Sequence, residues 1–213
     1  MPAKGFTAVA LFLLLIAFAF SANSKEKVLS VGIGPSWPTA LWGEDRPTAW
    51  NASLSTGITL DRKVSLGASA DFLWNQVIEE DVLSQGTSIA QRQQRTFMFP
   101  LSAYLSLSPA PDLTVSPIIY TSVGLNTMYY SHEDKSDGDD GDGGINVNGF
   151  YMGVIWKVGT EAVMSLSENV SFSARLFYTI SKLNKIEKSQ GDSKLRRRNM
   201  SGFSLMGGLN FYL

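Results

Sequence analysis

The sequence predicts an all-β fold, an eight-stranded antiparallel up-and-down transmembrane β-barrel. Three observations predict it. The segment 203–213, which reads FSLMGGLNFYL, alternates apolar with small or polar residues, and successive side chains of a strand point to opposite faces. A similar alternation recurs in seven earlier segments. The connections between the segments are alternately short and long, as they are at the two ends of a membrane barrel.

The N-terminal segment predicts a secretory signal peptide over 1–24, followed by the barrel over 25–213. Lys4 precedes an apolar run over 6–20, and small or polar residues follow at 21–24. A helix that crosses a membrane needs about 20 residues, so a single membrane anchor is the weaker interpretation. Removal of the leader takes away Lys4 alone among charged residues, which leaves 17 basic against 19 acidic residues.

Eight strands follow from the period-two pattern, and each has one apolar face. The predicted strands cover 28–34, 48–60, 64–75, 96–107, 113–130, 147–165, 170–181 and 203–213. Their apolar faces begin at Leu29, Trp50, Val64, Phe97, Leu113, Phe150, Val170 and Phe203 and continue at every second residue. Proline lacks a backbone donor, so Pro100 predicts a bulge or a weak point in the fourth strand.

The connections separate the two ends of the predicted barrel. Short turns are predicted at 61–63, 108–112 and 167–169. Long polar segments are predicted at 35–47, 76–95, 131–146 and 182–198. In a barrel of the outer membrane, short turns face the periplasm and long loops face outward.

Aromatic residues give a second indication of a membrane barrel, because they gather on the apolar faces at the long-loop ends of the strands. These residues are Trp50, Trp74, Phe97, Tyr129, Phe150, Tyr178 and Phe203. We interpret them as an aromatic girdle at the outer interface of a bilayer. The alternative is a soluble eight-stranded barrel, which would turn the apolar faces inward and leave the Gly/Ser/Asn faces in water.

The export signal, the amphipathic strands, the girdle and the terminal GLNFYL resemble the small outer-membrane barrels of the OmpA/OmpX/OmpW type. The resemblance covers nearly the whole chain after the leader, and it is one of pattern rather than of a diagnostic motif. It implies a Gram-negative outer-membrane location and assembly by the barrel insertion machinery. The closing residue of those families is usually aromatic, whereas here Leu213 follows Phe211 and Tyr212.

The inward faces carry four charged residues, Asp71, Lys157, Glu161 and Arg175. An eight-stranded barrel is just wide enough for its own side chains. Isolated charges in such an interior are costly, so we expect these four to pair into a buried ion network. The network is interpreted as a structural plug, and a gated ion path or a ligand contact is the alternative.

The sequence does not indicate an enzyme. Its one histidine, His132, lies between Ser131 and Glu133, and a catalytic triad needs set geometry from separate segments rather than adjacent residues. Outer-membrane lipid deacylases and acyltransferases also use eight-stranded barrels, but no catalytic His/Ser pattern of theirs is matched here. No cofactor is expected, and the absence of cysteine excludes disulfides and thiolate metal sites.

An acidic cluster lies in the third long segment. Its oxygen donors suit a hard cation such as calcium, but the spacing is not that of an EF-hand loop, so a solvated loop is the default interpretation. The weak candidate ligands are Asp137, Asp139, Asp140 and Asp142.

A basic cluster ends the last long segment, at the predicted level of the lipid headgroups. Guanidinium groups suit phosphates, so Arg196, Arg197 and Arg198 are candidates for contact with lipopolysaccharide phosphates, with a solvated charge run as the alternative. The run is short and the protein is expected to be exported, so no nucleic-acid partner is predicted.

These features favour a barrel with a filled interior and a structural, surface-display, adhesion or partner-binding role through its external loops. Outer-membrane lipid, lipopolysaccharide and envelope proteins are the expected partners. The alternatives are a narrow channel for small or hydrophobic solutes and a subunit of a larger envelope complex. A lipid-modifying enzyme is the weakest of the interpretations.

Overall fold

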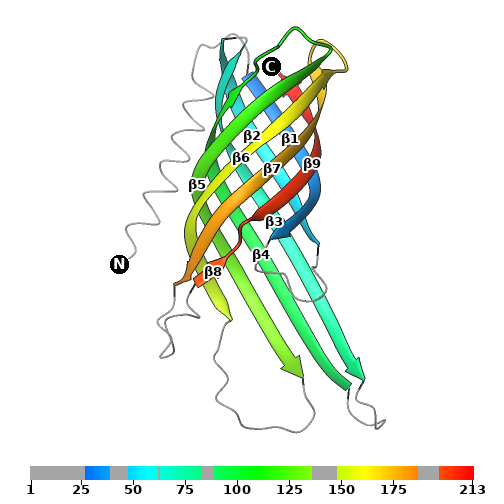
Figure 1. Ribbon diagram of the computed structural model, residues 1–213, viewed down its shortest axis with the longest axis vertical. Coiled ribbons are helices and arrows are strands. Elements are labelled where there is room, and N and C mark those ends of the chain that lie inside the picture. Colours follow the sequence, from blue (N-terminus) through cyan, green and yellow to red (C-terminus); the bar gives the residue numbers. More distant parts are fainter. Residues whose placement is uncertain (1–26, 39–47, 62, 83–88, 136–147, 187–196) are drawn as a thin grey trace.

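The computed structural model describes residues 27–38, 48–61, 63–82, 89–135, 148–186 and 197–213 (Figure 1). These residues form strands β1 Lys27–Pro38, β2 Ala49–Asp61, β3 Val64–Val82, β4 Ile89–Leu107, β5 Val115–Lys135, β6 Gly149–Ser165, β7 Val170–Lys185, β8 Arg197–Asn199 and β9 Gly202–Tyr212. The described residues include no helix of the length and hydrophobicity that a bilayer crossing requires. The predicted signal peptide, 1–24, lies outside the described residues.

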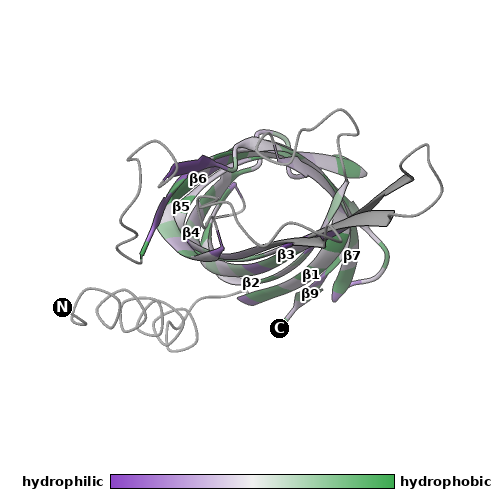
Figure 2. Ribbon diagram, turned by 90° about the horizontal axis from the view of Figure 1, so that it is seen from below, coloured by the Kyte–Doolittle hydropathy of each residue, from purple (hydrophilic) through white to green (hydrophobic). Residues whose placement is uncertain are grey.

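The strands form one closed antiparallel sheet (Figure 2). From β1 to β7, each strand pairs with the next strand in sequence. The last strand, β9, pairs with β7 on one side and with β1 on the other, which closes the ring. The three-residue β8 pairs with the end of β7 and continues the line of β9. The wall therefore has eight strands, and the predicted up-and-down barrel is confirmed.

The two ends of the barrel differ. At the short-turn end, tight connections join β2 to β3, β4 to β5 and β6 to β7. At the long-loop end, which is the lower end in Figure 1, the strands are joined by the longer segments. These two names are used for the ends from here on.

A row of Cα partners around the wall measures how far the strands are staggered. Starting at Val154 on β6, the row passes through Leu125, Leu101, Ala70, Leu54, Val31, Leu209 and Phe172. It returns to β6 at Met164, ten residues from its start, since 164 minus 154 is 10. Such a shear means that the strands are tilted relative to the barrel axis. Rows of Cα partners therefore run obliquely around the wall.

The outer face of the wall is apolar. Val154 is 61% exposed, and every wall strand carries exposed large apolar residues on this face. Examples are Val31, Leu54, Leu66, Leu105, Val123, Leu176 and Leu209. The inward positions are instead dominated by buried serine, asparagine and threonine residues. A soluble barrel would have the opposite distribution, so the apolar belt is a surface for lipid.

Several strands are longer than the sequence predicts. The expected loop 76–95 is largely strand, because β3 continues to Val82 and β4 begins at Ile89. Part of 131–146 also belongs to β5, and part of 182–198 belongs to β7 and β8. The reason is that backbone hydrogen bonds continue along paired strands after the apolar alternation has ended. The boundaries predicted from hydropathy marked the end of the lipid-facing stretch rather than the end of the strand.

Pro100 does not produce a bulge. The β3–β4 partners run to Ala70↔Leu101 and resume at Leu73↔Met98 in the same register. On its other side, Pro100 is a regular Cα partner of Asn126. The proline therefore leaves a local gap in the β3–β4 ladder. Of the two expected effects, a bulge and a weak point, the structure shows the weak point.

Candidate functional site

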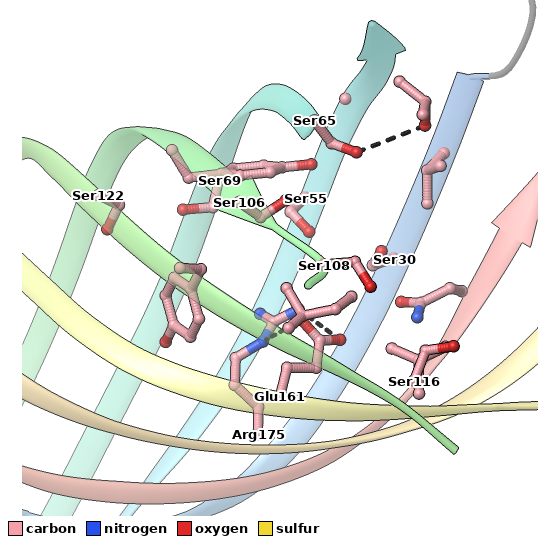
Figure 3. A pocket seen from close by; sticks show the side chains of 18 of the residues that line it. Ser30, Ser55, Ser65, Ser69, Ser106, Ser108, Ser116, Ser122, Glu161 and Arg175 are labelled. Carbon is pink, nitrogen blue, oxygen red and sulfur yellow. Dashed lines mark hydrogen bonds and ion pairs between the residues drawn. The ribbon is translucent and has the colours of Figure 1, made fainter. Parts of the chain in front are cut away.

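The interior of the barrel has two parts, which differ in chemistry. The part toward the short-turn end contains a cavity of about 340 Å³ with a polar wall (Figure 3). The part toward the long-loop end is filled by apolar side chains. The Lys157–Asp71 ion pair lies where the parts meet, and the Arg175–Glu161 ion pair lines the cavity.

The first ion pair joins Lys157 of β6 to Asp71 of β3, through Nζ and Oδ2. These strands are not neighbours in the sheet, so the pair crosses the interior. Both residues are buried, at 5% and 6% exposure. The Lys157 ammonium also lies 5.5 Å from the centre of the Phe177 ring. The pair therefore ties opposite sides of the wall together.

The second ion pair joins Arg175 of β7 to Glu161 of β6, which are direct Cα partners. The Arg175 Nε and Nη2 donate to Glu161 Oε2 and Oε1 at 3.3 and 3.2 Å, a two-bond arrangement that suits a guanidinium and a carboxylate. The Arg175 Cζ atom lies 5.3 Å from the centre of the Tyr120 ring. Each of the four charges predicted for the interior thus has a partner of opposite sign.

Hydroxyl-bearing side chains make up about half of the residues that line the cavity. Figure 3 shows serine side chains from β1, β2, β3 and β5 around one shared space. Some hydroxyls are engaged within the wall: Ser69 and Ser102 share a 2.8 Å hydrogen bond, and Ser116 Oγ donates to the carbonyl oxygen of Pro111 at 2.9 Å. Every second residue faces inward, so serine and glycine there keep the interior open.

Two polar atoms at the cavity have no hydrogen-bond partner among the described residues. They are Ser122 Oγ and Asn210 Oδ1, from side chains that are buried almost completely. The Asn210 amide nitrogen, by contrast, donates to Ser171 Oγ at 3.3 Å. Both atoms have almost no accessible surface, so they lie behind the surface of the cavity rather than in contact with its open space.

An apolar cluster closes the long-loop half of the interior. Four of its residues, Leu73, Met98, Met128 and Tyr151, are consecutive Cα partners across β3, β4, β5 and β6. The other members are Ala49, Tyr130, Leu183 and Met200. A second cavity, of about 20 Å³, lies between this cluster and Lys157, and it is large enough for about one water molecule.

The sequence did not predict the apolar cluster. Its residues are neighbours in sequence of the aromatic residues on the outer face, as in Leu73-Trp74 and Phe97-Met98. At this level both faces of each strand are apolar, so the alternation that distinguishes inside from outside disappears. The repeated apolar doublets at the long-loop end of the strands are the signal that could have revealed it.

The seven aromatic residues predicted as a girdle all lie on the outer face of the wall. Trp50, Trp74, Phe97, Tyr129 and Phe150 are consecutive Cα partners across β2 to β6. The remaining two, Tyr178 and Phe203, are Cα partners of each other, with ring centres 4.8 Å apart. Because Cα rows run obliquely around this barrel, the five-residue row is an inclined band.

The predicted loop sites lie at the long-loop end or beyond the described residues. Asp137, Asp139, Asp140, Asp142 and Arg196 are outside the described residues. Arg197 is exposed on β8, and the Arg198 guanidinium lies 3.9 Å from the centre of the Tyr130 ring. Backbone pairing places Ser131, His132 and Glu133 on β5, opposite Arg95, Gln94 and Gln93 of β4. The described residues contain no group of three or more potential metal ligands.

Comparison with known proteins places the fold. No family model matches the sequence, and no curated protein matches it. The structure is similar to the crystal structure of Neisserial surface protein A (NspA), with a TM-score of 0.52 and 13% identity over 88% of this chain and 97% of that chain. OprG of Pseudomonas aeruginosa has a TM-score of 0.46 and 11% identity over 89% and 96% of the two chains. Ail of Yersinia pestis has a TM-score of 0.45 and 13% identity over 89% and 99%.

The likeness to the Neisserial protein spans nearly the whole of both chains, and it agrees with the closed eight-stranded wall and the lipid-facing belt described above. The chain therefore has the fold of the small eight-stranded bacterial outer-membrane β-barrels.

Proposed function

We propose that this protein is an integral outer-membrane barrel that presents a protruding polar β-sheet at the cell surface for contact with other molecules. The barrel, whose interior is filled only toward the long-loop end, serves as a rigid anchor in outer-membrane lipid and lipopolysaccharide, and the long-loop end does the binding. A scaffold that holds working loops in place is a common division of labour in proteins.

The observation that carries this proposal is the continuation of β3, β4 and β5 beyond the rest of the wall (Figure 1). Beyond Trp74, the β3–β4 pairing continues from Asn75↔Thr96 to Val82↔Ile89. Pairing of β4 with β5 continues as far as Gln91↔Lys135. A transmembrane β-strand needs about 9 to 11 residues, so strands of 19, 19 and 21 residues exceed what a bilayer requires.

This extension is named the protruding sheet, and it consists of 75–82 on β3, 89–96 on β4 and 131–135 on β5. The β2–β3 pairs end at Trp50↔Trp74, and the β5–β6 pairs end at Tyr130↔Gly149. Among the described residues, no strand therefore pairs with the outer side of either edge strand of the protruding sheet. A sheet edge of this kind offers backbone donors and acceptors to another chain.

The contents of the interior support a scaffold over a channel. The apolar cluster and the Lys157–Asp71 ion pair occupy the path between the cavity and the long-loop end. The similar Neisserial protein is a surface protein by its name. Together these features favour contact at the outside over passage through the middle.

Orientation in the membrane is the first test. The chain has no cysteine, so single-cysteine variants give a clean signal. Arg95→Cys marks the base of the protruding sheet and Asp112→Cys marks the short-turn end, and both native residues are exposed. A membrane-impermeant maleimide should label Arg95→Cys on intact cells and Asp112→Cys after the outer membrane has been permeabilised. The reverse pattern would refute surface presentation of this sheet.

The second test is contact itself. A photo-crosslinking amino acid at Arg95 should give discrete adducts in the native envelope, and the same amino acid at Asp112 is the matched control. Adducts formed mainly at Asp112 would favour the alternative of a subunit bound on the periplasmic side. An absence of adducts at both positions would argue against partner binding at either end.

A further inference from the structure

The 340 Å³ cavity is accessible from the short-turn end. Its lining includes Lys63 of the β2–β3 connection together with Ser108, Pro111 and Asp112 of the β4–β5 connection. The Arg175–Glu161 ion pair lines its side, and the Lys157–Asp71 pair lies at its inner end, next to the small second cavity. The cavity is therefore a chamber with a mouth between the short turns and one ion pair at its floor. Its volume falls at the lower end of the range for small-molecule sites, about 300 to 1,000 Å³.

The charges at the cavity argue against an ionic occupant. Three cationic and three anionic side chains line it: Lys63, Lys157, Arg175, Asp71, Asp112 and Glu161. Four of these six are already joined in the two ion pairs. An incoming ion would have to compete with a bonded partner, which leaves the displaced charge buried and uncompensated.

The hydroxyl groups argue against an apolar occupant. Partly exposed hydroxyls at Ser30 and Ser106 face the cavity (Figure 3). The hydroxyl of Tyr104 belongs to the same lining. An apolar molecule would take water away from these hydroxyls without replacing its hydrogen bonds.

Aromatic rings complete the wall. Tyr104, Tyr120, Phe177 and Tyr212 line the cavity among the serines. Hydroxyl donors and acceptors interspersed with aromatic faces suit a molecule that has both polar groups and flat C–H surfaces. A sugar ring has this combination.

From these observations we infer that the cavity binds a neutral, polyhydroxylated small molecule of mono- or disaccharide size, which enters at the short-turn end. Ser30 and Ser106 supply hydroxyls to the bound molecule, and the two ion pairs leave no unpaired charge for an ionic analogue at the inner part of the cavity. If the barrel is oriented as proposed above, this site faces the periplasm. The binding itself does not depend on that orientation.

The test uses the full barrel in phospholipid nanodiscs, because sugar-based detergents would occupy the same site. Trehalose is the neutral probe and trehalose 6-phosphate is the charged match. Amide NMR shifts should move saturably with trehalose at Ser106, Tyr120 and Ser122, and should stay fixed at Met98 and Met128 in the apolar cluster. The phosphorylated sugar should bind at least about tenfold more weakly, a difference of roughly 1.4 kcal/mol.

Two variants locate the site. Ser30→Ala removes one partly exposed hydroxyl of the cavity wall and should weaken binding about fivefold, the effect of a single hydrogen bond of about 1 kcal/mol. Ser106→Leu narrows the mouth and should abolish the shifts. The control is Leu105→Ile. Leu105 is next to Ser106 in sequence but faces the lipid, so this variant should bind the sugar as the unmodified barrel does.

Three outcomes would overturn the inference. The first is the absence of saturable shifts with trehalose and also with glucose, the monosaccharide probe. The second is tighter binding of trehalose 6-phosphate than of trehalose, which would mean an anion site. The third is unchanged binding in a folded Ser106→Leu barrel, which would place the bound sugar elsewhere.

Discussion

Lys157 on β6 and Asp71 on β3 form an ion pair across the barrel interior, from strands that do not touch each other in the sheet. Both groups are buried, so each charge offsets the cost of removing the other from water, in addition to attracting it. This distinction gives a prediction that separates single from double substitutions.

Asp71→Leu or Lys157→Met alone should destabilise the barrel strongly, by about 3–5 kcal/mol, because each leaves a buried charge without its partner. The double variant Asp71→Leu/Lys157→Met should lie closer to the unmodified protein than either single variant. Urea unfolding of the reconstituted barrel measures the three free energies of unfolding. Additive losses in the double variant would show that the two charges are not coupled.

Closure of the interior is a second prediction. In planar bilayers the unmodified barrel should show no steady single-channel conductance, because the apolar cluster lies between the cavity and the long-loop end. Arg175→Ala should remain closed, since that substitution opens the ion-pair layer and leaves the cluster in place. Steady openings in Arg175→Ala would mean that the Arg175–Glu161 pair, rather than the cluster, is the barrier.

The lipid-facing belt gives a third prediction. Val154→Arg places a charge on the most exposed of the large apolar residues of β6, and it should cost about 2–4 kcal/mol if this position lies near the bilayer midplane. Leu166→Arg, in the short β6–β7 turn, is the matched control and should cost about 0–1 kcal/mol, because it lies near an interface. Equal costs at the two positions would contradict the placement of the belt.

Packing around Tyr104 gives a fourth prediction. Gly57 and Gly67 are Cα partners, and a Cβ added to either would meet the Tyr104 ring as well as backbone of the neighbouring strand. Gly67→Ala should therefore destabilise the barrel by about 1–3 kcal/mol, the usual cost of overpacking. Adding Tyr104→Ala should recover part of this loss, although the clash with the backbone remains. A double-mutant cycle with no coupling energy would contradict the contact.

Hydropathy alone was sufficient to predict the wall of this barrel. Apolar and polar residues alternate along each strand, as Leu54 and Ser55 do. The apolar residues therefore form the face toward lipid, and the polar residues form the face toward the narrow interior. The four inward charges were identifiable for the same reason, because Asp71, Lys157, Glu161 and Arg175 alternate with the residues of the lipid-facing side of their strands. Which of them pair could not be read from the sequence, since the Lys157–Asp71 contact crosses the interior between non-adjacent strands.

The protruding sheet was missed because its strands lose the apolar alternation. From Gln76 onward β3 is largely polar, and a polar stretch between two strands normally indicates a loop. Cross-strand hydrogen bonds do not require apolar side chains, however, so pairing continues to Val82↔Ile89. The apolar alternation in the sequence indicates how long the lipid-facing part of each strand is. The backbone pairing in the structure shows how far each strand continues beyond that part.

The fifth prediction separates the protruding sheet from the barrel that carries it. Gln76 and Arg95 are Cα partners, so residues 77–94 can be replaced by a two-residue Asn-Gly turn, which suits a hairpin between antiparallel strands. The shortened barrel should keep its free energy of unfolding within about 1 kcal/mol, because changes away from the core and the belt usually have small effects. A photo-reactive group at Ser131 of β5, the Cα partner of Arg95 of β4, should no longer form crosslinks in the shortened barrel. A large loss of stability would instead make the extension part of the folding unit, and its length would then reflect the needs of the fold rather than of surface contact.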